Sequence, residues 1–200
     1  MSDHYYSEKP TVDSEERDFA FTLRGKSFRF FSDRGVFSKS EIDYGSQLLI
    51  DSFVFPTIEG DFLDVGCGYG PIGLSLASVE KDRVVHMVDI NERALNLSSK
   101  NADRNSINNV KIYKSDRLVN VEKNDFAAII TNPPIRAGKQ IVHSIFEQSF
   151  EHLKEQGELW IVIQKKQGAP SAIEKLESLF NEVDIVLKKK GYYIIVAKKV

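Results

Sequence analysis

The feature that most constrains the fold is an alternation of short apolar strands and helical patterns that begins near residue 61. The first predicted strand, 62–65, runs directly into a loop with glycine at every second position. Further strand patterns lie at 84–88, 110–113, 126–130 and 159–163, and helical patterns separate all of them except 110–113 and 126–130. This alternation predicts parallel strands joined by helical crossovers, which is a doubly wound α/β fold.

Both ends of the chain depart from this pattern. Alternating apolar residues at 19–23 and 28–30 flank Gly25 and predict a β-hairpin before the sheet. Near the other end, 183–187 and 192–197 predict two strands joined by a tight turn with no helix between them. The sheet is therefore expected to have seven strands, mostly parallel, with a terminal antiparallel strand. Among the helices, Asn91 is expected to cap the one that runs to about residue 105, and the one expected over 140–153 should stop at Gly157.

Composition excludes several kinds of protein. The longest apolar runs are about five residues, too short to cross a bilayer. The single cysteine excludes an internal disulfide and a cysteine-based zinc cluster, and the four histidines have no metal-ligand spacing. We therefore expect a cytoplasmic protein with no metal ion and no membrane partner. Net charge is −2, and the basic clusters at 136–139, 165–166 and 188–190 are interpreted as solvated turns.

The glycine loop, DVGCGYG at 64–70, predicts the cofactor. Glycine lets the backbone turn sharply and lets a ligand approach it closely. A dinucleotide would rest its pyrophosphate on the following helix, but Pro71 removes one N–H donor there and Asp64 would repel a phosphate. S-adenosyl-L-methionine (SAM) has no phosphate, and its α-ammonium group suits a carboxylate. The spacing favours SAM, with these cofactor-binding residues in the loop: Asp64, Gly66, Cys67, Gly68 and Gly70. Cys67 is interpreted as a small side chain in a tight turn, not as a nucleophile.

Two more acids follow predicted strands. Asp89 ends the second strand, where a carboxylate can accept hydrogen bonds from both ribose hydroxyls. Asp116 follows the third strand, where it could accept from the adenine amino group. Open α/β sheets bind ligands at this edge, so we expect both side chains to contact the cofactor.

An Asn-Pro-Pro sequence at 132–134 follows the fourth strand and predicts the chemistry. The amide oxygen of Asn132 and the carbonyl of Pro133 can accept the two hydrogens of an exocyclic NH₂ group. Held in this way, the nitrogen presents its lone pair to an electrophile, and the arrangement becomes more favourable as positive charge develops. Asn132 and Pro133 are the predicted catalytic residues, and Asn132 is also expected to contact the cofactor.

With these residues in place, the chain resembles class I SAM-dependent N-methyltransferases, and more closely the catalytic domain of the bacterial 16S ribosomal RNA guanine-N2 methyltransferases of the RsmC type. The resemblance covers roughly 19–200. It rests on the loop at 64–70, Asp89, the segment 132–139 and an upstream set: Gly35, Val36, Phe37, Ser38, Asp43, Gly45 and Ser46. It implies a Rossmann-like SAM methyltransferase domain over 35–200, preceded by an arm and hairpin over 1–34.

The resemblance also implies a substrate, the 2-amino group of a guanine in 16S ribosomal RNA, and a partner, ribosomal RNA or the small ribosomal subunit. These residues are expected on the substrate side: Pro134, Ile135, Arg136, Lys139 and Phe37. Many amino-methylating relatives have Phe or Tyr at the position of Ile135, to stack on the target base. Phe37 is a candidate substitute for that aromatic ring, and a core role is its alternative.

Larger members of the group have two related domains, the first of which helps to bind RNA, whereas 200 residues accommodate one. The N-terminal hairpin, dimerisation or partly assembled subunits are alternative sources of affinity for RNA. The oligomeric state stays open. Two other functions compete: methylation of a protein glutamine, whose amide is a similar planar NH₂, and a SAM-binding module without turnover. The proline after the glycine loop and the terminal hairpin disfavour a nicotinamide dehydrogenase.

Overall fold

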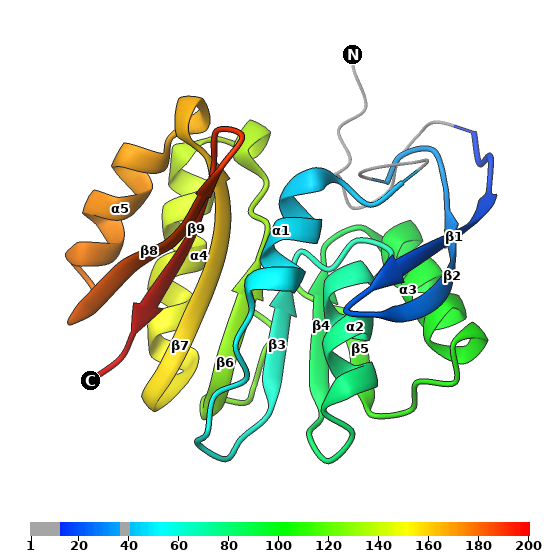
Figure 1. Ribbon diagram of the computed structural model, residues 1–200, viewed down its shortest axis with the longest axis horizontal. Helices are drawn as coiled ribbons and strands as arrows, with labels where there is room; N and C mark the ends of the chain where they lie inside the picture. Colours follow the sequence, from blue (N-terminus) through cyan, green and yellow to red (C-terminus); the bar gives the residue numbers. More distant parts are fainter. Residues whose placement is uncertain (1–12, 37–40) are drawn as a thin grey trace.

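The structure is a computed structural model that describes residues 13–36 and 41–200. Its centre is a seven-stranded sheet in the order β5-β4-β3-β6-β7-β9-β8 (Figure 1). Neighbouring strands are parallel except where β9 pairs with β7 and β8, so the doubly wound sheet with a terminal antiparallel strand is confirmed. The strands are β3 (Phe62–Val65), β4 (Val85–Asp89), β5 (Val110–Lys114), β6 (Phe126–Thr131), β7 (Leu153–Gln164), β8 (Glu182–Lys189) and β9 (Tyr192–Lys198).

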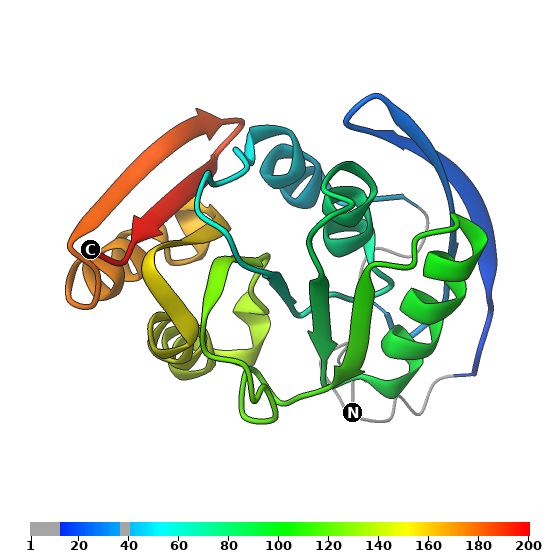
Figure 2. The same cartoon turned by 90° about the horizontal axis from the view of Figure 1, so that it is seen from below.

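Helices cover both faces of the sheet (Figure 2). On one face lie α1 (Tyr44–Ser52), α2 (Pro71–Val79) and α3 (Glu92–Arg104), and on the other α4 (Lys139–His152) and α5 (Ala169–Glu177). Two short 3₁₀ helices, η1 (Ile135–Ala137) and η2 (Lys165–Gln167), follow β6 and β7. Each face has its own apolar core, and burial of these side chains provides the main stabilisation of the fold. Among the described residues, no helix combines the length and apolar character needed to cross a membrane.

The predicted hairpin is confirmed as β1 (Arg17–Leu23) and β2 (Lys26–Ser32), which form a separate two-stranded sheet. Arg24 and Gly25 both have positive φ, 48° and 76°, as the two central residues of a type I′ turn require. Phe28 and Phe30 point into the core shared with α1, α2 and α3. The hairpin therefore packs on the α/β sheet domain as part of its hydrophobic core.

Two asparagines, one in α3 and one directly after its last residue, hold the free edge of β2. Asn101 accepts from the N–H of Phe31 (2.7 Å) and donates to its carbonyl (2.9 Å). Asn105, one turn later, makes the same pair of bonds with Arg29 (3.0 and 2.9 Å). Residues four apart on a helix share a face, and residues two apart on a strand point the same way, so the two amides match the strand. They substitute for a neighbouring strand at this edge.

Local signals predicted most element boundaries. Asn91 caps α3 by accepting from the N–H groups of Arg93 and Ala94, and Pro71 is the first residue of α2, both as expected. The expected stop of the fourth helix at Gly157 is wrong, because α4 ends at His152 and Gly157 lies inside β7. A Cβ at Gly157 would stand 2.8 Å from the carbonyl oxygen of Lys154 in the same strand and 2.9 Å from that of Phe126 in β6. Close backbone packing within β7 and against β6, not a helix end, is therefore the reason for glycine at this position.

Candidate functional site

The predicted site residues follow three neighbouring strands at the carboxyl edge of the sheet. Val65 of β3 pairs with Val88 of β4 on one side and with Thr131 of β6 on the other. Gly66, Asp89 and Asn132 come next on these strands, so they begin about 5 Å apart from strand to strand. The strand order reverses between β3 and β6, which makes this edge the topological switch point where such sheets bind ligands. A pocket of about 1510 Å³ opens there, lined by residues of all three loops.

The glycines of the loop serve two purposes. Gly66 and Gly68 have φ of 76° and 57° and line the pocket, and a Cβ on either would meet no atom within 4 Å. Gly70, with φ 103°, is packed instead, because a Cβ there would lie 2.9 Å from Leu74 and 3.0 Å from Met87. The first two glycines leave the pocket floor bare for a ligand, whereas the third lets α2 approach β4.

Asp64 lies beneath the loop and is completely buried. One carboxyl oxygen accepts from the N–H of Gly73 in the first turn of α2 (2.8 Å), and the other has no hydrogen-bond partner among the described residues. Burial raises the pKa of Asp64 to about 7, the bond from Gly73 opposes this rise, and the nearby charge of Asp89 adds to it. Asp64 is not among the residues that line the pocket, so its predicted contact with the cofactor stays a prediction.

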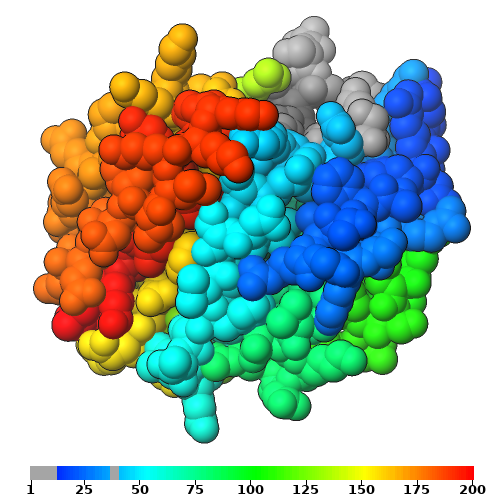
Figure 3. Space-filling view, viewed as in Figure 1, coloured from blue at the N-terminus to red at the C-terminus, as the bar shows by residue number. Residues whose placement is uncertain are grey.

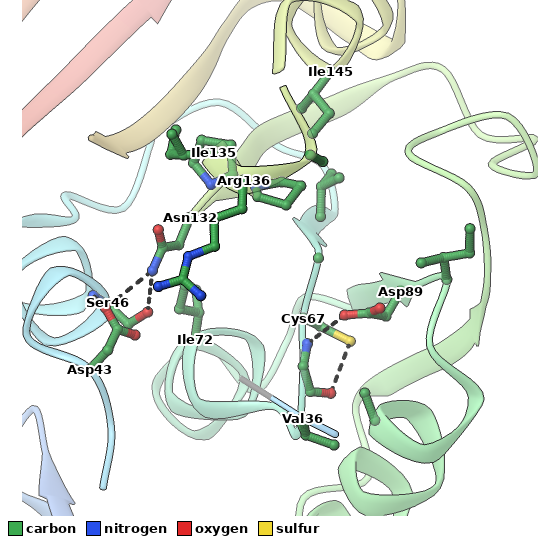
Figure 4. A pocket seen from close by; sticks show the side chains of 18 of the residues that line it. Val36, Asp43, Ser46, Cys67, Ile72, Asp89, Asn132, Ile135, Arg136 and Ile145 are labelled. Carbon is green, nitrogen blue, oxygen red and sulfur yellow. Dashed lines mark hydrogen bonds between the residues drawn. The ribbon is translucent and has the colours of Figure 1, made fainter. Parts of the chain in front are cut away.

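Asp89 lines the pocket and is held in a fixed orientation (Figure 4). Its two oxygens accept from the N–H groups of Gly68 and Asn91, both at 2.9 Å. Burial raises the pKa of Asp89, and the backbone bonds act in the opposite direction. Each carboxylate oxygen has a further lone pair, so Asp89 can still accept from hydroxyl groups of a ligand.

Cys67 and Asp116 also line the pocket. The thiol of Cys67 lies 3.8 Å from Ser98 Oγ, and burial raises its pKa well above the ordinary value, which disfavours the reactive thiolate. Asp116 is half exposed, and both of its oxygens accept from the guanidinium of Arg117 (3.0 and 2.8 Å). An adenine amino group would therefore share Asp116 with Arg117.

Asn132 is oriented by two residues at the start of α1. Its Nδ2 donates to Asp43 Oδ1 (3.2 Å) and to Ser46 Oγ (3.0 Å). A carboxylate can only accept, so the amide nitrogen must face Asp43. Figure 4 shows the amide oxygen turned away from both partners. Asp43 Oδ1 also caps α1 through the N–H of Ser46 (3.0 Å), which fixes the helix and the amide with one group.

The backbone after Asn132 turns tightly. The N–H of Ile135 donates to the carbonyl of Pro133 (2.9 Å) across Pro134, whose φ and ψ are −76° and 81°. These angles are those of an inverse γ-turn. The Pro133 carbonyl keeps one lone pair, so Asn132 and Pro133 together provide two acceptors at the end of β6.

Only some of the residues predicted on the substrate side line the pocket. Pro134, Ile135 and Arg136 line the pocket, and the side chain of Arg136 points into it (Figure 4). Lys139 does not line the pocket; it is exposed at the start of α4. Phe37 lies outside the described residues, so its candidate role stays a prediction.

Several long-range hydrogen bonds around the pocket were not part of the sequence interpretation. Asn91 Nδ2 donates to the carbonyl of Gly35 (2.9 Å), and Gly35 and Val36 line the pocket. On the opposite side, Gln164 donates to the hydroxyl of Tyr192 (2.6 Å), and both residues line the wall. Asp43 and Ser46 matched the resemblance, but only the fold reveals their bonds to Asn132. No local motif signals these long-range pairs.

Comparisons with known proteins agree with this geometry. The family model described as "Methyltransferase small domain" matches residues 27–196. "Uncharacterized protein YbxB" of Bacillus subtilis (strain 168) is 69% identical over the whole of both chains. "Ribosomal RNA small subunit methyltransferase C" of Vibrio parahaemolyticus is 31% identical over 92% of this chain and 53% of its own length. The chain thus spans about half the length of the curated rRNA methyltransferases that it matches.

A solved structure has the same fold. The T. thermophilus 16S rRNA N2 methyltransferase (RsmC), in complex with AdoMet and guanosine, superposes with a TM-score of 0.82 at 24% identity. The match covers 96% of this chain and 52% of that one. The likeness extends over the sheet and its helices and confirms the Rossmann-like methyltransferase fold.

Proposed function

This chain belongs to the methyltransferase small domain family, and from that premise we propose that it transfers a methyl group from SAM to the exocyclic 2-amino group of a guanine in 16S ribosomal RNA. The carrying observation is the oriented amide of Asn132, whose nitrogen is bound by Asp43 and Ser46 while its oxygen is left to accept. Relatives named for small-subunit rRNA methylation support the choice of RNA.

The cofactor side of the pocket fits SAM. Gly66 and Gly68 leave open space where side chains would otherwise stand. Asp89 presents a carboxylate with free lone pairs, suited to ribose hydroxyls. The acids around the pocket suit a ligand with two cationic groups, and Pro71 at the start of α2 makes the helix a poorer phosphate site. A volume of about 1510 Å³ exceeds that of a typical single-ligand site and leaves room for a nucleoside beside the cofactor.

The residues at the end of β6 account for the reaction. When bound, SAM supplies a methyl group on a positively charged sulfur, which keeps the electron pair of the breaking C–S bond. Asn132 Oδ1 and the Pro133 carbonyl accept the two hydrogens of the amino group and turn its lone pair toward the cofactor side. Their partial negative charges stabilise the positive charge that develops on nitrogen. One N–H proton then leaves to water, so no strong base is required. Alignment and electrostatics provide the acceleration.

The test supplies the purified protein with tritiated SAM and three acceptors from a strain that lacks this gene: 30S subunits, free 16S rRNA and total protein. We expect label in RNA, and digestion to nucleosides should yield N2-methylguanosine. An Asn132→Ala variant serves as the matched control and should incorporate little label. Label in protein would favour glutamine methylation instead, and label on a different nucleoside would reject the guanine N2 target.

A further inference from the structure

The three basic clusters, separate in sequence, meet at one edge of the folded protein. Lys139 begins α4 after β6, Lys165 and Lys166 follow β7, and Lys188 to Lys190 form the β8–β9 turn. The N–H of Lys165 donates to the carbonyl of Gly191 (2.8 Å), which joins the second cluster to the third. Figure 1 shows the β8–β9 turn and the end of β7 at the same edge, and Figure 3 shows this edge at the surface. We call this set the lysine rim: Lys139, Lys165, Lys166, Lys188, Lys189 and Lys190.

Among the residues that the structure describes, no ion pair compensates the charges of the rim. All six lysines are exposed, and none forms an ion pair with a described residue. Residues 132–140, 164–168 and 188–192 contain no Asp or Glu. On β8 the nearest acid is Asp184, about 16 Å along the strand from Lys189, which is beyond the Debye length of about 8 Å in physiological salt. Within these segments and along β8, no acid therefore neutralises the positive field of the rim, and the acid that adjoins it is Asp43, which precedes Tyr44 in the chain.

One helix adds to this field. The amino end of α4 lies next to the rim, and this helix has no side-chain cap and no acid in its first turn. The amino end of α5 contributes less, because Pro170 removes one N–H donor there. Lys139 occupies the first position of α4, where the helix dipole disfavours a cation. A bound anion would relieve this repulsion and accept hydrogen bonds from the free N–H groups.

The rim is continuous with the substrate side of the pocket. Lys190 Nζ lies 4.9 Å from the centre of the Tyr44 ring, and Tyr44 packs edge-on against Tyr192 at 5.6 Å. Tyr192 is part of the pocket wall, and Tyr44 lies in the chain between Asp43 and Ser46, the two residues that orient Asn132. A chain bound along the rim would therefore pass the end of β6.

The cations around the hairpin are arranged differently. Arg29 and Arg104 both pair with Asp18, at 2.9 and 2.7 Å, and Lys100 pairs with Glu16 at 2.6 Å. These charges are compensated within the protein. The hairpin is thus a weaker candidate for binding a polyanion than the lysine rim.

We propose that the lysine rim binds the phosphate backbone of the RNA strand that carries the target base, an inference that rests on the proposed function. Lysine binds phosphate as a point charge without reading sequence, so the rim would position the strand and leave selection of the base to the pocket. The rim accounts for how a chain of net charge −2 acquires affinity for RNA: seven of its 27 Lys and Arg, including Arg136, lie in these three segments.

The test compares charge-matched triple variants. The rim triple carries Lys165→Gln, Lys166→Gln and Lys189→Gln, and avoids the two lysines that lie over tyrosine rings. The control triple carries Lys81→Gln, Lys111→Gln and Lys198→Gln, all outside the rim. Binding to fluorescently labelled 16S rRNA fragments is measured from 50 to 200 mM KCl, without turnover, and binding of SAM is measured by calorimetry.

We expect the rim triple to bind RNA roughly 100-fold more weakly than wild type near 0.1 M salt. The slope of log affinity against log salt concentration should become less steep by about 2, as for the loss of three phosphate contacts to a single strand. The control triple should lose less than about 3-fold, and SAM affinity should stay constant in both. A Lys→Arg version of the rim triple should restore binding. Equal losses in both triples, or no loss in the rim triple, would overturn the proposal.

This readout separates the two proposals. If wild type binds RNA through the rim but no N2-methylguanosine forms, the proposed function fails and the rim stands. If methylation of RNA proceeds equally well in wild type and the rim triple at limiting RNA, the rim fails and the function stands. Label in an acidic protein that depends on the rim would overturn both.

Discussion

The ends of β3 and β4 carry two carboxylates bonded to backbone N–H groups, the buried Asp64 and the partly buried Asp89, whereas the segments after β6, β7 and β8 carry exposed lysines that form no ion pair with a described residue. We call the first region, with the hairpin and α3, the cofactor half, and the second the substrate half. A small cationic ligand requires fixed carboxylates, and burial keeps them in place. A flexible polyanion is held by many exposed charges, which need no fixed geometry. Asn132 lies between the halves and belongs to both.

Asn132→Ala should produce the largest effect, because it removes the acceptor at the boundary of the two halves. We expect methyl transfer to fall by about 10²- to 10³-fold, as when one preorganised transition-state group is lost. Binding of SAM and of RNA should each change little, since each depends on its own half. Single-turnover kinetics with calorimetry of SAM binding checks this, and turnover close to that of wild type would reject the assigned role.

The second effect is a pH dependence that arises in the cofactor half. Burial raises the pKa of Asp64 from 3.8 to about 7 in the folded protein. The stabilisation from this group is therefore complete below about pH 4 and is lost as the pH rises through 7. In Asp64→Asn the free energy of unfolding should depend less on pH, by on the order of 1 kcal/mol per pH unit between 4 and 7.

Urea unfolding from pH 4 to 8 measures this difference. Asp184→Asn, on the exposed strand β8 of the substrate half, is the matched control and should follow the wild-type curve. If the curves of Asp64→Asn and wild type run parallel, the carboxyl group is not buried as described.

Asp89→Ala tests the cofactor half at the pocket itself. It removes the carboxylate that is proposed to accept from the ribose and that also bonds the N–H groups of Gly68 and Asn91. We expect SAM binding to weaken by about 1–3 kcal/mol, the range for hydrogen bonds to charged groups. RNA binding should be unaffected. Unchanged SAM affinity in calorimetry would exclude the ribose contact. An equal loss of RNA affinity would contradict the assignment of SAM binding and RNA binding to separate halves.

The elements that sequence predicted correctly depend on local signals. The glycine loop, the Asn91 cap and the Gly25 turn each act within a few residues, so their patterns are visible in the chain. Gly157 was misinterpreted because the glycine is required by close backbone contacts with Lys154 and with Phe126, which is 31 residues away, and a helix stop and a packing glycine look alike in sequence.

The site could be predicted only in part for the same reason. The Asn-Pro-Pro segment predicted two acceptors, Asn132 and Pro133, but the orientation of the Asn132 amide depends on Asp43, 89 residues earlier in the chain. Similarly, three lysine clusters that look like separate solvated turns meet only because of the strand order around β7 and β9. Strand order and register are tertiary properties, so no local pattern reports them.

Asp43→Ala should have the smallest effect, part of it on the stability of the fold and part on catalysis. Loss of the α1 cap should lower the free energy of unfolding by about 1 kcal/mol. Loss of one of the two partners of Asn132 should lower kcat by about 10-fold, because Ser46 still holds the amide but less firmly. SAM affinity should not change, whereas a general structural defect would lower it. Asp43→Asn keeps an oxygen in the same place for both bonds and should restore stability and kcat together. If Asp43→Asn restores stability alone, the charge of Asp43 acts on the reaction directly and orientation of Asn132 is not its main role.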